Sequence, residues 1–103
     1  MKSYKRDLDA AKIKEWIAPC DFYMREQDLH RYCYKSGQWA VSGLCPFHDD
    51  GTIGSFKVNS DSGAFICFSC GAKGGDIITY TEKKYEHSFR EALEKLHSEW
   101  RVS

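Results

Sequence analysis

Residues 45–48 read CPFH and residues 67–70 read CFSC, and these two short stretches decide the fold. Within each stretch, two residues lie between the metal-binding side chains, so both can reach one ion from a tight turn. Three cysteines and one histidine fill the tetrahedral shell of zinc without leaving an open position, which is typical of a structural site. The sequence therefore predicts one structural Zn²⁺ ion bound by Cys45, His48, Cys67 and Cys70.

Disulfide and redox alternatives fit these cysteines less well. A disulfide from Cys45 to Cys67 or Cys70 conflicts with the odd total of five cysteines and with the reducing compartment expected below. A redox pair of Cys67 and Cys70 requires a thioredoxin-like βαβ context, which the pattern lacks. Cys20 and Cys33 fall outside both stretches, and we expect them to be small buried residues.

The composition indicates a single small domain of 103 residues. Fifteen basic and fifteen acidic residues cancel, so no overall positive field attracts the chain to nucleic acid. No apolar run approaches the ~20 residues that a membrane span needs, and the first ten residues lack an apolar signal core. We therefore expect a cytoplasmic protein without a membrane partner.

Helical periodicity marks both ends of the chain. Apolar residues of segment 7–18 fall near one helical face, and Pro19 is expected to end this helix. Residues 20–27 predict a short helical turn capped by Asp21. Near the other end, Asp76 is expected to cap a helix over residues 77–85, and Ser88 with Glu91 forms a capping box. That box opens a helix whose predicted core stripe is Phe89, Ala92, Leu93, Leu96 and Trp100.

The middle of the chain has the pattern of two β-hairpins. Residues 29–44 contain β-prone segments around a turn at Ser36–Gly37, and residues 55–68 contain alternating segments around a polar turn. The fold class is therefore α+β, a small zinc ribbon in which an antiparallel sheet of two hairpins is flanked by N- and C-terminal helices. We expect one domain over residues 1–103, divided into a helical lead-in (7–28), the ribbon (29–75) and the C-terminal helices (76–100).

Residues 43–50 and 55–80 together resemble the CHC-type zinc ribbon at the N-terminus of bacterial DnaG-type primases. The resemblance includes the four proposed zinc ligands and the surrounding Pro46, Phe47, Phe56, Val58, Phe65, Phe68, Gly71, Ala72 and Gly74. It implies a ribbon that contacts single-stranded template DNA and helps a polymerase domain choose where a primer starts. In that family a separate Toprim-type core joins the nucleotides, so the resemblance implies that this chain is not itself an enzyme. The implied partners are template DNA and a primase catalytic subunit or helicase, in a bacterium or encoded by a phage or plasmid, with the oligomeric state left open.

Charge alone predicts weak DNA binding by the ribbon. Residues 31–75 contain four basic and three acidic residues, and a zinc ion with three thiolates subtracts one further charge. Stacking of bases on aromatic rings must then contribute. The expected contacts are Lys57, Lys73, Phe56, Arg31, Lys35 and Trp39.

Two other functions compete with template binding in trans. A zinc-scaffolded protein–protein adaptor is favoured by the near-zero local charge and by Gly51, where the primase family usually has a lysine. An independent enzyme would need a second cluster of acidic or nucleophilic residues. Asp49 and Asp50 follow His48 directly, but a turn that exposes two solvated carboxylates explains them more simply.

Overall fold

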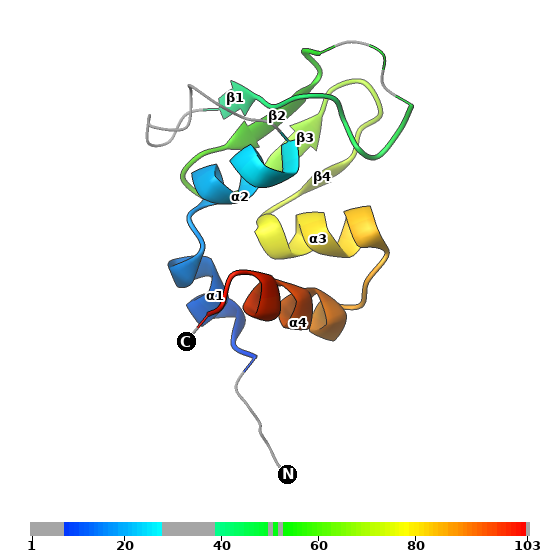
Figure 1. Ribbon diagram of the computed structural model, residues 1–103. Coiled ribbons are helices and arrows are strands. Elements are labelled where there is room, and N and C mark those ends of the chain that lie inside the picture. The colour runs from blue at the N-terminus through cyan, green and yellow to red at the C-terminus, as the bar shows by residue number, and fades with distance from the viewer. Residues whose placement is uncertain (1–7, 28–38, 50, 52, 103) are drawn as a thin grey trace.

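The computed structural model describes residues 8–27, 39–49, 51 and 53–102, which form four helices and a four-stranded sheet (Figure 1). The sheet and the helix α2 make up one end of the molecule, and α1, α3 and α4 make up the other (Figure 1). The predicted turn at Ser36–Gly37 and Cys33 lie outside the described residues. The helices are α1 (Ala10–Trp16), α2 (Pro19–Gln27), α3 (Ile77–Tyr85) and α4 (Phe89–Glu99), and the strands are β1 (Trp39–Val41), β2 (Phe56–Asn59), β3 (Phe65–Cys67) and β4 (Lys73–Gly74).

The first two helices meet at Pro19. The carboxylate of Asp9 caps α1 by accepting the Ala11 N–H at 3.0 Å. Pro19 is the first residue of α2. Proline is tolerated at this position because the N–H groups in the first turn of a helix have no partner within the helix, so the missing N–H costs nothing. The prediction of only a short turn capped by Asp21 is wrong, since α2 has nine residues and Asp21 lies inside its first turn.

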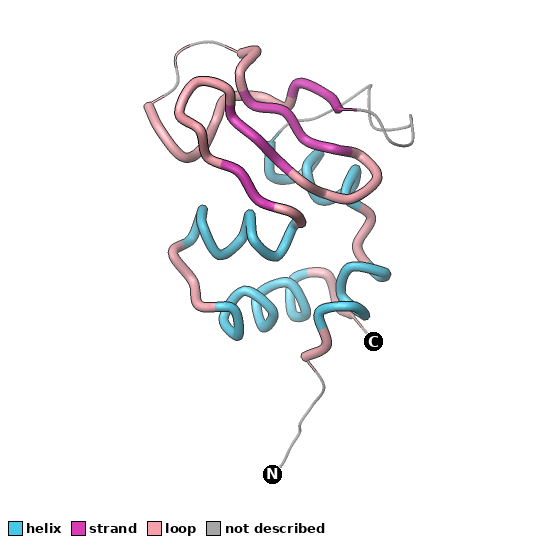
Figure 2. The backbone as a smooth tube through the Cα atoms, turned by 180° about the vertical axis from the view of Figure 1, so that it is seen from behind, coloured by secondary structure: helices cyan, strands magenta, loops and turns pink. Residues whose placement is uncertain are grey.

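The sheet is antiparallel throughout, in the order β1-β2-β3-β4. Its predicted second hairpin is confirmed, with Phe56 opposite Cys67 and Val58 opposite Phe65. The side chain of Asn59 accepts the N–H groups of Asp61 and Ser62 at 2.9 Å and so shapes the turn between β2 and β3. Helix α2 covers one face of the sheet in Figure 1, and the opposite face is turned toward the viewer in Figure 2.

The two C-terminal helices begin at the predicted caps. Asp76 accepts the Thr79 N–H at 2.9 Å, and Ser88 and Glu91 exchange both hydrogen bonds of a capping box. The predicted core stripe of α4 is buried at Ala92, Leu93 and Leu96 and half-buried at Trp100, but Phe89 is 53% exposed. Phe89 is the first residue of α4, directly after the N-cap Ser88.

Tyr80 of α3 is the centre of the aromatic core. Its ring lies 5.4 Å from Phe22 and 5.2 Å from Tyr23 of α2, and 5.6 Å from Phe47 and 5.7 Å from Phe65 of the ribbon. These edge-on contacts join both helices to the inner face of the sheet. The helices and the ribbon therefore share one core. None of the helices in the described parts of the chain is long and apolar enough for a membrane span.

Candidate metal centre

Two loops and the end of β3 bring the four predicted ligands together. Cys45 and His48 lie in the loop between β1 and β2, Cys67 is the last residue of β3, and Cys70 lies in the loop before β4. The two loops lie side by side at one end of the sheet (Figures 1 and 2). All four ligand atoms are within 4.8 Å of one another. The antiparallel pairing of β2 with β3 thus joins two halves of a site that are 18 residues apart in the sequence.

The distances fit a tetrahedral zinc site. Zinc–sulfur bonds of about 2.3 Å place two tetrahedral thiolates about 3.8 Å apart. The sulfur atoms of Cys45 and Cys70 are 3.8 Å apart, and the sulfur of Cys67 is 4.0 Å from Nδ1 of His48. Because these four ligands complete the shell, the arrangement leaves no position for a substrate or an activated water molecule.

Backbone N–H groups are placed to stabilise thiolates in both loops. The N–H of Phe47 donates to the sulfur of Cys45 at 3.4 Å, and the N–H of Cys70 donates to the sulfur of Cys67 at 3.5 Å. Burial would raise the pKa of Cys67, but the N–H groups of Cys70 and Ser69, together with the thiols of Cys45 and Cys70, outweigh burial, and the pKa of Cys67 is lowered. Such outer hydrogen bonds orient metal ligands and tune their basicity.

For Cys45 the balance is reversed, because burial outweighs the hydrogen bond from the backbone N–H of Phe47. Burial raises the pKa of Cys45 to about 12, and the neighbouring thiols of Cys67 and Cys70 add to the rise. Zinc binds the thiolate, so the ion must displace a proton from this side chain at neutral pH. Zinc affinity is therefore expected to fall as the pH falls.

A buried glutamine that the sequence analysis did not single out supports the first loop. The side-chain amide of Gln27 donates to the carbonyl oxygens of Ser42 at 2.9 Å and Leu44 at 2.7 Å, and its oxygen accepts the Tyr80 hydroxyl at 2.6 Å. Gly43 has a φ of +63°, and a Cβ there would meet the Gln27 carbonyl oxygen at 2.4 Å. Local sequence gave no signal for these contacts, because the partners of Gln27 are 15 to 53 residues away in the chain.

The outer face of the sheet carries two of the predicted lysines. The register places Val41, Lys57, Ile66 and Lys73 opposite one another in a row that crosses all four strands. Cross-strand partners project from the same face, and Phe56, Val58 and Phe65 on the neighbouring positions are buried. Trp39, two residues before Val41, projects from the same face and is 49% exposed.

The remaining predicted contacts have other positions. Phe56 is fully buried between the sheet and the core, so its ring cannot stack on a base, and this prediction is wrong. Strand alternation explains the error, because Lys57 and Phe56 must face opposite sides. Arg31 and Lys35 lie outside the described residues. Cys20 is half-buried rather than fully buried.

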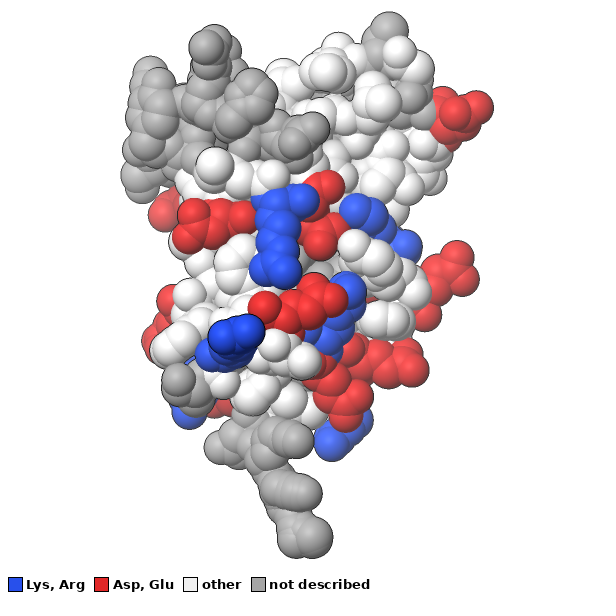
Figure 3. Space-filling view, viewed as in Figure 1, with Lys and Arg blue, Asp and Glu red and all other residues white. Residues whose placement is uncertain are grey.

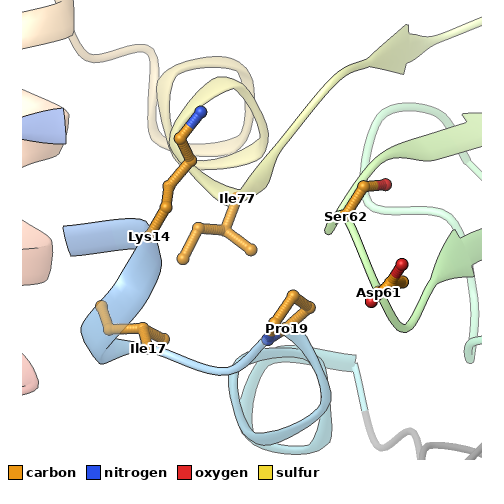
Figure 4. A pocket seen from close by; sticks show the side chains of 6 residues that line it. All are labelled: Lys14, Ile17, Pro19, Asp61, Ser62 and Ile77. Carbon is orange, nitrogen blue, oxygen red and sulfur yellow. The ribbon is translucent and has the colours of Figure 1, made fainter. Parts of the chain in front are cut away.

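A cavity of about 230 Å³ lies where the helices meet the ribbon (Figure 4). Ile17, Pro19 and Ile77 form its apolar wall, and Asp61 and Ser62 face them from the turn between β2 and β3 (Figure 4). The ammonium group of Lys14 points away from this space in Figure 4 and forms an ion pair with Asp76 at 3.2 Å. These side chains do not converge on a common point, so we assign no ligand site to this cavity.

An antiparallel sheet whose loops bring three cysteines and a histidine to one point defines a structural zinc ribbon. Residues 29–103 match the family model of the DnaG zinc ribbon, described as the CHC2 zinc finger, and the chain belongs to this family. The four-ligand cluster and the family together assign one structural zinc ion to the chain.

Similar proteins are primases. The chain is 40% identical over 90 residues to the DNA primase of Mycolicibacterium smegmatis and 44% identical over 90 residues to that of Streptomyces coelicolor. Each alignment covers 87% of this chain but 13% of the primase. The crystal structure of the Aquifex aeolicus primase, which contains zinc-binding and RNA polymerase domains, is similar with a TM-score of 0.66 and 29% identity. That similarity covers 89% of this chain and 22% of the primase chain.

Proposed function

We propose that the chain is a non-catalytic primase module that binds single-stranded template DNA on the outer face of its sheet. In this proposal it assists a primase catalytic subunit in starting primers and acts in trans. The family and the primase relatives support a role in priming. The closed zinc shell supports a structural rather than a catalytic metal.

The row of Lys57 and Lys73 on the outer face is the observation that carries the DNA-binding proposal. Among the described residues, neither lysine forms an ion pair, so both charges are available to phosphates. The described acidic residues of the ribbon, Asp49 and Asp61, lie in loops rather than on a strand. Exposed Trp39 and Phe68, whose ring lies 5.6 Å from the Lys57 ammonium, add aromatic surface beside the charges.

The helices offer a poorer surface for DNA. In Figure 3 most of the charged side chains on that face lie over the helices, with acidic and basic groups interspersed. Several lysines and arginines of the helices form ion pairs, including Lys84 with Glu26 and Arg90 with Glu94. The sheet face therefore fits a nucleic acid better than the face shown in Figure 3.

Fluorescence anisotropy with a labelled 12-nucleotide single strand tests the DNA-binding proposal. The double variant Lys57→Ala/Lys73→Ala should bind more weakly and should lower the slope of log affinity against log salt by about 1.4, or about 0.7 for each lost phosphate contact. The matched control is Lys12→Ala/Lys83→Ala, which removes two exposed lysines from the helices. Negligible binding by the unmodified protein, or equal binding by both double variants, would exclude this role for the sheet face.

A primer-synthesis assay tests the action in trans. The protein is added to a primase catalytic subunit from the same genome on a single-stranded template, and labelled primers are counted and sized. We expect more primers, or new start positions, with the unmodified protein than with Lys57→Ala/Lys73→Ala. Primer yields and start positions that do not respond to the protein would contradict assistance in trans.

A protein–protein adaptor is the second candidate, and exposed apolar side chains near the zinc site favour it. Ile53 and Phe68 are each 68% exposed, and Leu44, next to Cys45, is 47% exposed. Apolar groups gathered at one end of a small domain are typical of an interaction surface. Under this alternative, Phe68→Ser would abolish capture of the catalytic subunit, while oligonucleotide binding would be absent in every variant.

A further inference from the structure

An open basin on the outer sheet face lies beside Lys73. It has a volume of about 460 Å³ and is lined by side chains or backbone from both edges of the sheet. Trp39 comes from β1, and Lys73 and Gly74 come from β4. Trp39 and the opposite edge strand thus line the same space. The remaining lining residues are Phe65, Ile66 and Gly75.

The residues around the basin either lack a side chain or have a side chain that is engaged elsewhere, so the basin beside Trp39 stays open. Asn59 is the cross-strand partner of Trp39, but its side chain is engaged in the turn between β2 and β3. Gly74 is the cross-strand partner of buried Phe65 and so faces the inner side of the sheet, where the Phe65 ring would lie 2.5 Å from an added Cβ. At Gly75 an added Cβ would meet no atom within 4 Å. The basin is thus floored by apolar groups and flanked by one exposed aromatic face.

We propose that this basin, which we call the Trp39 basin, binds a single unpaired nucleobase stacked on the Trp39 indole, while Lys73 contacts an adjoining phosphate. The inference rests on the proposed function and deepens it by naming the position of one base. Charge complementarity favours a nucleic acid over an apolar peptide, because Lys73 lies at the basin and Lys57 lies two strands away in the same row. An aromatic face beside a cationic side chain is the combination by which proteins hold single strands without reading their sequence.

The side chains that flank the basin offer hydrogen-bond donors only. The ammonium of Lys73 and the indole N–H of Trp39 can donate but cannot accept. Neither can distinguish bases through a complementary pattern of donors and acceptors, so stacking should dominate over base identity. The Trp39 basin is therefore a stacking position for any base.

An oligonucleotide without bases separates the contribution of base stacking to the affinity from the contribution of phosphate contacts. The anisotropy measurement uses a labelled dT12 strand and a strand of the same length and charge in which abasic spacers replace the bases. For the unmodified protein we expect dT12 to bind about five- to tenfold more tightly than the abasic strand, the effect of stacking one base. Trp39→Ala should remove most of the difference between the two strands, and Trp39→Phe should restore most of it.

Trp16→Ala is the matched control, because Trp16 is 51% exposed on α1 and is as accessible as Trp39. It should leave the binding of both strands unchanged. Circular dichroism and zinc content confirm that each variant is folded. As a direct readout, dT12 should quench tryptophan fluorescence in the unmodified protein and in Trp16→Phe, but much less in Trp39→Phe.

The outcomes distinguish this inference from the function on which it rests. If dT12 binds and Lys57→Ala/Lys73→Ala weakens it, but Trp39→Ala does not, the base position is wrong and the DNA-binding proposal stands. If the unmodified protein binds dT12 and the abasic strand equally well, the base position is likewise wrong and the DNA-binding proposal stands. If neither strand binds, both proposals fail. Loss of catalytic-subunit capture in Trp39→Ala would then assign the basin to a protein partner.

Discussion

Gln27 connects the helices to the zinc loop through three hydrogen bonds made by one buried side chain. Its amide reaches the carbonyl oxygens of Ser42 and Leu44, directly before Cys45. Burial, together with the charge of Glu26, raises the pKa of Tyr80 far above its ordinary value, so the Tyr80 hydroxyl stays protonated and donates to Gln27. Zinc binding by Cys45 should therefore depend on a residue that does not touch the ion.

Gln27→Leu should destabilise the protein and loosen the zinc site. The substitution keeps most of the side-chain volume but leaves two carbonyl groups and the Tyr80 hydroxyl buried without this partner. We expect a loss of about 3 kcal/mol in urea unfolding, since each buried polar group left unbonded costs about 1–3 kcal/mol. Zinc transfer to a chelating indicator should also be faster.

Tyr80→Phe is the comparison for this prediction because it removes only one of the three bonds. It should cost about 1 kcal/mol. The double variant should cost less than the sum, since the hydroxyl that Gln27→Leu leaves unbonded is then absent. Gln27→Leu with unfolding and zinc transfer like those of the unmodified protein would show that the loop holds its shape without Gln27.

At the scale of elements, Asp76 performs two tasks at the start of α3. Its carboxylate caps the helix through the Thr79 N–H and pairs with Lys14 of α1 at 3.2 Å. Burial alone would raise the pKa of Asp76, but these bonds outweigh it, and the pKa is lowered below 3.8. Folding thus favours the ionised form. The resulting stability is present above pH 3.8 and is lost as the pH falls through the lower folded-state pKa.

Asp76→Ala should cost about 1 kcal/mol in urea unfolding at pH 7, because the cap is lost. Asp76→Asn should cost less, since asparagine caps a helix about as well as aspartate and loses only the partly exposed pair with Lys14. Lys14→Ala, which leaves the cap in place, should resemble Asp76→Asn. Equal stability of Asp76→Ala and the unmodified protein at pH 7 would show that the cap contributes little to α3.

Elements with local signals were predictable from sequence, and elements set by distant contacts were not. The caps Asp76 and Ser88 and the hairpin over residues 55–68 were predicted because a few neighbouring residues determine them. Pro19 was assigned to the end of a helix because proline breaks helices from within but also begins them. Phe89 has the helical period of a core residue but is 53% exposed, because the period alone does not show which residues of the stripe are covered by other elements.

The same division applies to the site. The zinc ligands were predictable because their spacing is specific for zinc, whereas the exposed face of the sheet required the strand register. Alternation alone showed that the side chains of Lys57 and Phe56 project from different faces of the sheet. It did not show which of these faces packs against the core. Packing against Tyr80 decides this, and Tyr80 is 24 residues beyond Phe56 in the chain.

At the scale of the whole molecule, the zinc ion and the aromatic core stabilise the same sheet from two sides. The strands are short, with two to four residues each, and Cys45 and Cys67 are themselves part of the core. Zinc binding by such sites is worth about 10–16 kcal/mol, which equals or exceeds the ~5–15 kcal/mol stability of a typical domain. Since Tyr80 packs against both the ribbon and α2, loss of the sheet should also weaken the helices.

Zinc removal should therefore unfold the four-stranded sheet and lower the melting temperature of the remainder. Circular dichroism and thermal unfolding with and without a chelator measure this, and added zinc should restore both signals. The double variant Cys67→Ser/Cys70→Ser should behave as the chelated protein does, whereas Cys20→Ser, outside the site, should keep one zinc ion per chain. Because Cys45 must lose a proton to bind zinc, the zinc affinity of the protein, corrected for protonation of the chelator, should fall as the pH falls from 8 to 6. A chelated protein with an unchanged spectrum and melting temperature would show instead that the aromatic core around Tyr80 holds the sheet without the ion.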